Sequence, residues 1–221
     1  MLLGDERREL CEAGRQTAES GLVIGAAGNL SVRSGDLVAI SPSGVELDRL
    51  TPEGIPVIDM EGRVVAAEGD VVAEGGGAPS SETPMHLAIY ATTDAAAIVH
   101  THSTYGAVVA ATMAELPPIH YYTLLLGGVV RVADYAAYGT PELAGSVRTA
   151  LAGRRAALMA NHGGVAIGGT LAEAYENARL LEWLCGVYVR AKTIGEPRLL
   201  TEAELGELTE RGFGPPALPP R

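Results

Sequence analysis

The sequence predicts a mixed α/β fold, in which a central and mostly antiparallel β-sheet is flanked by helices. Short apolar runs typical of strands are intermixed with longer helical segments, without the regular strand–helix–strand alternation of a parallel sheet. A hydrophobic content of 47% with 28 glycines in 221 residues fits one compact domain with a substantial core. We therefore expect one domain over residues 1–211, followed by a proline-rich tail over 212–221.

Six segments are expected to be helical. In the first, Leu10, Ala13 and Thr17 share one side and charged residues take the other. In the fifth, an apolar stripe extends from Leu171 to Val187. The predicted helices are 5–20, 83–91, 104–113, 140–151, 170–192 and 202–209.

Apolar runs bounded by glycine, proline and polar turn residues predict the strands. Hairpins are expected across the turns Ser34-Gly35-Asp36 and Glu61-Gly62, and a third follows Asn161-His162-Gly163-Gly164. The predicted strands are 29–33, 37–40, 56–60, 63–67, 95–102, 129–133, 156–160 and 165–167.

Charge and composition exclude several classes of partner. Sixteen basic against 27 acidic residues give a formal net charge of −11, which argues against a nucleic-acid or anionic-membrane surface. No apolar run reaches the roughly 18 residues of a transmembrane helix. Met1–Cys11 lacks the apolar stretch of a secretory signal, so a cytoplasmic protein is expected. Cys11 and Cys185, far apart in predicted helices, are expected to be reduced thiols.

Two histidines stand two residues apart at the end of a predicted buried strand. Side chains alternate along a strand, so His100 and His102 project from one face and their rings can converge on one metal ion. Imidazole is the commonest protein ligand for zinc and similar metals. Two half-exposed histidines without a metal are the alternative that this pair by itself leaves open.

The best candidate for a third ligand is His162. It follows a predicted strand and precedes Gly163-Gly164, where small residues allow a ligand to approach closely. Three imidazoles with one open position are the usual arrangement of a catalytic zinc site. The remaining histidines, His86 inside a predicted helix and His120 in a loop, are expected to serve packing or to lie at the surface.

Glu82 supplies a carboxylate at the start of the helix predicted over 83–91. Near a dication, such a carboxylate can abstract a proton next to a carbonyl. It can equally be an acid that the helix dipole favours by about 0.3–1 kcal/mol. Composition does not separate these two interpretations. Ser81 is expected to cap the same helix.

Three short loops have the composition of phosphate cradles. Gly28-Asn29, Ser43-Gly44 and Ser80-Ser81 offer backbone N–H groups, hydroxyls and an amide with little steric bulk. Neutral donors of this kind suit a protein of net charge −11. Each loop taken singly can also be a turn or a helix cap without a ligand.

Five segments occur in an order that resembles a known family. They are Gly28-Asn29-Leu30-Ser31, Ser41-Pro42-Ser43-Gly44, Pro79-Ser80-Ser81-Glu82, His100-Thr101-His102 and Asn161-His162-Gly163. Together they resemble the class II aldolase/adducin head family, and most closely its fuculose-phosphate aldolases. The resemblance extends from about Arg7 to Thr209, nearly the whole chain.

The resemblance implies a role for each matching residue. His100, His102 and His162 would bind Zn²⁺, for which Mn²⁺ or Co²⁺ could substitute. Glu82 would be a fourth ligand in the resting enzyme and would move away to act as acid and base. The substrate phosphate would be held by Gly28, Asn29, Ser43, Gly44, Ser80 and Ser81.

The family also implies an assembly. Its aldolases are tetramers with active sites at subunit interfaces, which would make this chain a homotetramer. Tyr121 stands where the family has a tyrosine that reaches into a neighbouring subunit's site. The chain departs from the pattern at Phe213, where fuculose-phosphate aldolases carry a catalytic tyrosine. A phenyl ring cannot donate a proton, so either Tyr121 or water serves that step, or the aldehyde half of the substrate differs.

The implied activity is zinc-dependent and reversible cleavage of a phosphorylated ketose, such as L-fuculose 1-phosphate. The products would be dihydroxyacetone phosphate and an aldehyde, formed through a metal-stabilised enediolate. L-ribulose-5-phosphate 4-epimerase and sugar-acid-phosphate decarboxylase activities are alternatives on the same metal site. Epimerases carry aspartate where Glu82 stands, so Glu82 favours the aldolase. The adducin branch uses the fold for protein interaction without catalysis, which the three histidines and Glu82 disfavour.

Overall fold

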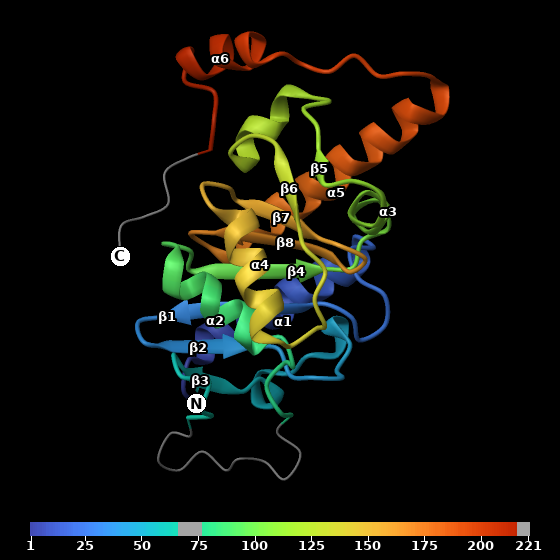
Figure 1. Cartoon of the computed structure of the whole chain (residues 1–221). Coiled ribbons are helices and arrows are strands. Elements are labelled where there is room, and N and C mark those ends of the chain that lie inside the picture. Colours follow the sequence, from blue (N-terminus) through green and yellow to red (C-terminus); the bar gives the residue numbers. More distant parts are fainter. Residues whose placement is uncertain (66–76, 216–221) are drawn as a thin grey trace.

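The computed structural model describes residues 1–65 and 77–215 (Figure 1). Its strands are β1 (Asn29–Ser34), β2 (Leu37–Ile40), β3 (Val57–Asp59), β4 (Ala97–Thr101), β5 (Glu115–Leu116), β6 (Val130–Ala133), β7 (Ala156–Met159) and β8 (Gly163–Gly168). They form one eight-stranded sheet in the order β3-β2-β1-β4-β8-β7-β6-β5. Within the described chain, β6 and β7 run parallel, whereas the other neighbouring strands are antiparallel. The predicted fold class is confirmed.

Helices cover both faces of this sheet. They are α1 (Gly4–Glu19), α2 (Thr83–Thr92), α3 (Thr104–Thr112), α4 (Pro141–Leu151), α5 (Leu171–Ile194) and α6 (Glu202–Glu210), with the 3₁₀ helices η1 (Leu47–Arg49), η2 (Pro52–Gly54) and η3 (Tyr121–Leu126). Helices α2 and α4 pack on one face, and α1, α3 and α5 pack on the other (Figure 1). None of the helices in the described ranges combines the length and apolar character that a membrane crossing would need.

The two cores are separated by the alternation of side chains along each strand. On β4, Ile98 is buried in the core beneath α2 and α4, and Val99 is buried in the core on the opposite face. Because successive side chains point to opposite faces, His100 projects to the same face as Ile98. The end of β4 therefore delivers His100 toward the beginning of α2.

All six predicted helices are confirmed, but one predicted cap is wrong. Glu82, and not Ser81, is the N-cap residue of α2. The chain forms a hydrogen-bonded turn from Ser80 to Thr83, and the Ser80 hydroxyl accepts the backbone N–H of Glu82 at 3.2 Å. This turn leaves Ser81 exposed and places the Glu82 side chain at the buried end of the helix.

The second predicted hairpin is confirmed in part. Strand β3 is shorter than predicted, and its return arm pairs through an isolated bridge between Ile58 and Val64. The last two residues of that arm, 66 and 67, lie outside the described residues, as does 216–221 of the predicted tail. Both Cys11 and Cys185 are free and buried, as predicted.

Candidate metal and active site

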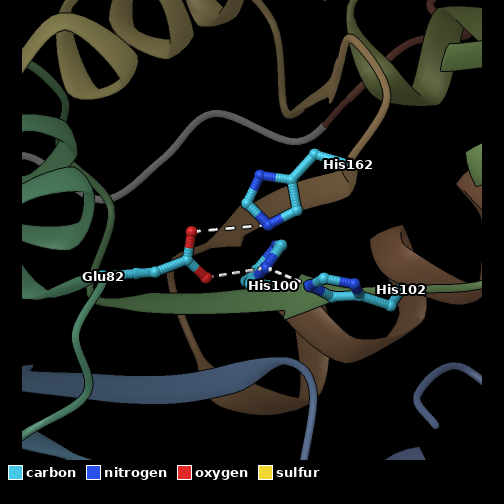
Figure 2. Close-up of side chains that lie close together, drawn as sticks. All are labelled: Glu82, His100, His102 and His162. Carbon is cyan, nitrogen blue, oxygen red and sulfur yellow. Dashed lines mark hydrogen bonds and ion pairs between the residues drawn. The ribbon is translucent and has the colours of Figure 1, made fainter. Parts of the chain in front are cut away.

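Three imidazoles and one carboxylate converge at the end of β4. His100 lies within β4, His102 follows it, His162 lies in the turn between β7 and β8, and Glu82 begins α2. The three histidine rings have centroids 4.8, 5.0 and 4.8 Å apart, so they form a nearly equilateral triangle. Figure 2 shows the carboxylate of Glu82 pointing into this triangle. The potential ligand atoms all lie within 4.8 Å of one another.

The separations suit a single divalent cation. The Nε2 atom of His100 lies 2.9 Å from Glu82 Oε2 and 3.0 Å from the Nε2 atom of His102 (Figure 2). Ligand atoms around tetrahedral zinc are about 3.3 Å apart when each bond is about 2.05 Å. Glu82 Oε1 lies 3.5 Å from His162 Nε2 and is buried without a hydrogen-bond partner among the described residues. An unpaired buried carboxylate oxygen is costly, and a cation would satisfy it.

Backbone constraints hold the histidines in this arrangement. A Cβ atom at Gly163 would lie 2.1 Å from the carbonyl oxygen of Thr101, so only glycine allows β8 to pair with β4 at this point. Asn161, at φ 54°, adopts the left-handed conformation that turns the chain before His162. Gly28, at φ 87°, approaches the carbonyl oxygen of His100 from β1, where a Cβ atom would come within 2.8 Å.

The protonation states also suit a metal centre. His100 Nδ1 donates to the carbonyl oxygen of Gly164 at 2.9 Å, which leaves its Nε2 lone pair directed at the cluster. Burial lowers the pKa of His102 to about 4 and also lowers the pKa of His162, so both rings are neutral near pH 7. Burial alone would raise the pKa of Glu82, but its close approach to His100 and the hydrogen bond that it accepts from Asn29 hold this pKa below its usual value.

His86 is a buried polar residue that the sequence did not connect with the site, and it lies behind the Glu82 carboxylate, joined to it through Asn29. The side-chain amide of Asn29 donates to Glu82 Oε2 at 3.0 Å, and the Nε2 atom of His86 lies 2.5 Å from Asn29 Oδ1. His86 is fully buried and is not one of the converging ligands, as expected, but it makes polar contacts instead of merely filling space. His86 follows Glu82 by four residues, which places both side chains on the same face of a helix. This spacing was the signal in the sequence that could have connected His86 with Glu82.

A cavity of about 590 Å³ opens onto the cluster. Its lining includes Glu82, His102 and His162, so the predicted base and two of the predicted ligands are accessible from it. The same cavity brings together every predicted phosphate-binding residue, namely Gly28, Asn29, Ser43, Gly44, Ser80 and Ser81.

One wall of the cavity was not anticipated from the sequence. Tyr135 and Tyr138, which are 69% and 71% exposed, line it together with the two alanines between them. The loop that carries them approaches the cradle closely, since a Cβ atom at Gly139 would lie 2.7 Å from the carbonyl oxygen of Ser81. Neither tyrosine belongs to a motif with known chemistry, so the sequence did not predict that they line the site.

Tyr121 lies outside this cavity. It begins η3 and belongs to what we call the aromatic cluster, whose members are His120, Tyr121, Tyr122, Trp183 and Phe213. Its ring stacks on His120, with centroids 4.5 Å apart, and contacts Phe213 at 5.2 Å. The two aromatic residues that the family resemblance connects with catalysis, Tyr121 and Phe213, are therefore neighbours, but not in the cavity formed by their own chain.

Comparison with known proteins agrees with this geometry. The 5-deoxy-D-ribulose 1-phosphate aldolase of Bacillus thuringiensis serovar kurstaki is 39% identical over 219 residues, which cover 97% of this chain and 99% of that protein. The 5-methylthioribulose-1-phosphate/5-deoxyribulose-1-phosphate aldolase of Rhodospirillum rubrum is 39% identical over 93% of this chain and 90% of its own length.

The fold is matched equally well. A solved structure of an L-fuculose 1-phosphate aldolase superposes with a TM-score of 0.87 at 39% identity, covering 96% of this chain and 98% of that chain. The family model of the Class II Aldolase and Adducin N-terminal domain matches residues 8–189. With this match and these relatives, the chain belongs to the class II aldolase and adducin N-terminal domain family, as one of its metal-dependent aldolases, which are carbon–carbon lyases.

Proposed function

We propose that this chain reversibly cleaves a ketose 1-phosphate into dihydroxyacetone phosphate and an aldehyde, with Zn²⁺ held by His100, His102 and His162. The observation that carries the proposal is the convergence of a carboxylate with three imidazoles at a cavity that also contains all three phosphate-cradle loops. Glu82 would be the fourth ligand while no substrate is bound. Three imidazoles favour Zn²⁺, and Mn²⁺ or Co²⁺ could substitute.

Glu82 is the proposed acid and base. A bound divalent cation supplies a Lewis acid that polarises the carbonyl of the substrate. In the synthetic direction, Glu82 takes a proton from the carbon next to that carbonyl in dihydroxyacetone phosphate, and in the cleavage direction it returns that proton. Its Oε2 already contacts Asn29 and His100, whereas Oε1 lacks a hydrogen-bond partner among the described residues. Oε1 is therefore the oxygen that would carry the proton.

The hydroxyl across the breaking bond needs a second proton acceptor. We assign this step to Tyr121 of a neighbouring copy, or to water. Support comes from the exposure of Tyr121, which is 38%, and from its absence among the residues that line the cavity of its own chain. We accordingly propose that the domain over residues 1–211 functions as a cytoplasmic homotetramer with its sites at subunit interfaces.

The phosphate is proposed to bind at the three loops. The backbone N–H of Ser43 already donates to the carbonyl oxygen of Ala78, and that of Ser80 donates to Ser41. The contributions of Ser43 and Ser80 would therefore come from their hydroxyls, beside the exposed Ser81 and Gly44. Such local dipoles hold an anion without a positive field, which this chain of net charge −11 does not supply.

The aldehyde half is proposed to end in an apolar group. L-Fuculose and 5-deoxyribulose 1-phosphates both end in a methyl group, and 5-methylthioribulose 1-phosphate ends in a thioether. A wall containing Tyr135, Tyr138 and two alanines would accept such an end better than a hydroxymethyl group. The similarity to proteins named for these three substrates supports the class, and it supports 5-deoxyribulose 1-phosphate at least as strongly as L-fuculose 1-phosphate.

The test is product analysis with purified protein loaded with Zn²⁺. The panel contains the 1-phosphates of 5-deoxyribulose, 5-methylthioribulose, L-fuculose and ribulose, the last of which ends in a hydroxymethyl group. We expect release of dihydroxyacetone phosphate, with kcat/KM lowest for ribulose 1-phosphate. Chelation should abolish cleavage and added Zn²⁺ should restore it.

A variant pair tests the role of the carboxylate. Glu82→Gln should lower kcat by about 10³-fold, because an amide cannot accept the proton. Glu207→Gln, an exposed change on α6, should leave kcat unaltered. Full activity of Glu82→Gln would contradict the mechanism. Inversion of a sugar carbon in place of aldehyde release would support the epimerase alternative, and release of CO₂ from a sugar-acid phosphate added to the panel would support the decarboxylase alternative.

A further inference from the structure

We infer that His86, Ser31 and Tyr90 form a one-directional hydrogen-bond relay that fixes the Asn29 amide and thereby positions the Glu82 carboxylate. His86 is a positioning residue in this relay, since it acts on the reaction through Asn29 and Glu82. The inference rests on the proposed function, in which Glu82 moves the proton. It adds three residues from β1 and α2 that do not line the cavity.

The relay is continuous in the structure. The Tyr90 hydroxyl lies 2.7 Å from Ser31 Oγ, which lies 2.7 Å from His86 Nδ1. On the other edge of the same ring, His86 Nε2 lies 2.5 Å from Asn29 Oδ1, and Asn29 Nδ2 lies 3.0 Å from Glu82 Oε2. His86, Ser31 and Tyr90 are fully buried, and Asn29 is 6% exposed, so water does not compete for these contacts.

The direction of each hydrogen bond follows from the carboxylate. An ionised carboxylate only accepts, so the NH₂ group of Asn29 faces Glu82 and its oxygen faces His86. His86 must then carry its proton on Nε2, which leaves Nδ1 as an acceptor for the single hydroxyl proton of Ser31. The Ser31 oxygen in turn accepts from Tyr90. Every donor is thereby assigned from Tyr90 to Glu82.

As a consequence, one carboxylate oxygen of Glu82 is held by hydrogen bonding, and the other remains able to accept a proton. Glu82 Oε2 is held through the relay, while Oε1 has no hydrogen-bond partner among the described residues. His86 is fully buried, where a charged ring would be costly, so the ring stays neutral and keeps this pattern. A carboxylate released from Asn29 could rotate about its side chain, and an error of about 1 Å at a reacting atom can cost 10²-fold in rate.

The first experiment compares two substitutions at position 86 in the Zn²⁺-loaded protein. His86→Leu removes both ring contacts and should lower kcat for a cleaved ketose 1-phosphate by about 10- to 100-fold, with KM changed by less than about threefold. His86→Gln can still donate to Asn29 and should recover most of the loss. If His86→Leu retains the kcat of the wild-type protein, or if His86→Gln loses as much as His86→Leu, the inference is wrong.

A matched control separates positioning from simple stability. Thr17 is fully buried on the opposite face of the sheet, and its hydroxyl donates to the carbonyl oxygen of Ala13 at 2.7 Å. Thr17→Val should lower the unfolding temperature without changing kcat. Should His86→Leu fail to fold, Ser31→Ala serves in its place, with an expected loss in kcat of about fivefold or more. An unchanged kcat in folded Ser31→Ala would then overturn the relay.

A readout independent of turnover uses Co²⁺ alone as a probe. In the wild-type protein, Glu82 held by Asn29 should give one defined visible absorption spectrum for bound Co²⁺, and His86→Leu should change that spectrum. An identical spectrum in both proteins would contradict the relay. If the wild-type protein cleaves no ketose 1-phosphate, the proposed function fails, and this spectrum still decides whether the relay positions Glu82.

Discussion

Two regions of this molecule gather histidine with other polar or aromatic side chains, but only one of them has the character of a chemical site. At the end of β4, His100 is fully buried and its lone pair faces two other imidazoles and a carboxylate. In the aromatic cluster, His120 stacks on Tyr121, beside a Trp183 that is 47% exposed. The first region is organised by converging lone pairs and the second by ring contacts.

The difference shows that residue type alone does not identify a histidine that could bind a metal ion. The tautomer of His100 is set by its contact with the carbonyl oxygen of Gly164, which aims the other nitrogen at the cluster. The Nδ1 atom of His120 accepts the backbone N–H of Tyr122 at 3.1 Å and thereby caps the start of η3. His100 thus directs its acceptor nitrogen at the other imidazoles and the carboxylate, whereas His120 uses its acceptor nitrogen to cap η3.

The largest expected effect separates the two regions directly. His102→Ala removes one of the three imidazoles proposed as ligands and should lower both Zn²⁺ content and kcat/KM, the latter by about 10³-fold or more. His120→Ala removes a histidine from the aromatic cluster and should leave Zn²⁺ content unchanged. Metal analysis and an aldol cleavage assay on both proteins check this prediction. Equal Zn²⁺ content in the two variants would mean that the three imidazoles are not the metal site.

A glycine pair should give the next largest effect, on stability. A Cβ atom at Gly163 would lie 2.1 Å from the Thr101 carbonyl oxygen, so Gly163→Ala should lower the free energy of unfolding by about 3 kcal/mol. Gly206 lies within α6, where a Cβ atom would meet nothing within 4 Å, and Gly206→Ala should raise the stability by up to about 1 kcal/mol. Denaturant unfolding measures both changes. Equal stability of the two variants would remove the argument that close strand approach holds His162 in place.

The smallest expected effect concerns the aromatic cluster itself. Tyr121→Phe should lower kcat by about tenfold, because water can replace the phenol that we propose a neighbouring copy supplies. Tyr122→Phe, which changes the adjacent ring in the same cluster, should leave kcat unchanged. Steady-state kinetics and sedimentation of both variants check this. If the two variants have the same kcat, Tyr121 has no part in the proton transfer.

Much of the fold could be predicted from the sequence because helices and strands are marked by local periodicity. The helix predicted over 170–192 is one example, since the structure has α5 over Leu171–Ile194 and buries Leu171, Leu181 and Leu184 of the predicted apolar stripe. The predicted N-cap of α2 was wrong because local preference favours serine over glutamate at this position. The turn from Ser80 to Thr83 places the start of the helix at Glu82, although the Glu82 side chain makes no capping hydrogen bond.

Like the fold, the candidate site could be predicted in part from the sequence. The spacing of two residues between His100 and His102 predicted that their rings would meet, and they do, although β4 ends at Thr101 and His102 follows it. Tyr135 and Tyr138 were missed because nothing local distinguishes them from other exposed tyrosines. The loop containing Gly139 brings them to the cavity through a close backbone approach to Ser81 that no sequence pattern encodes.

The sequence by itself determined the helices, most of the strands, the pair of histidines at the end of one strand and the donor-rich composition of the predicted phosphate loops, because each depends on residues a few positions apart. Only the tertiary structure decided that Glu82 and His162 meet that pair, and that His86 joins Asn29 behind the carboxylate. The physical reason is the strand order β1-β4-β8, which brings segments far apart in sequence to one end of the sheet. The tertiary structure also decided that Tyr121 lies outside the cavity of its own chain, in the aromatic cluster where its ring contacts Phe213.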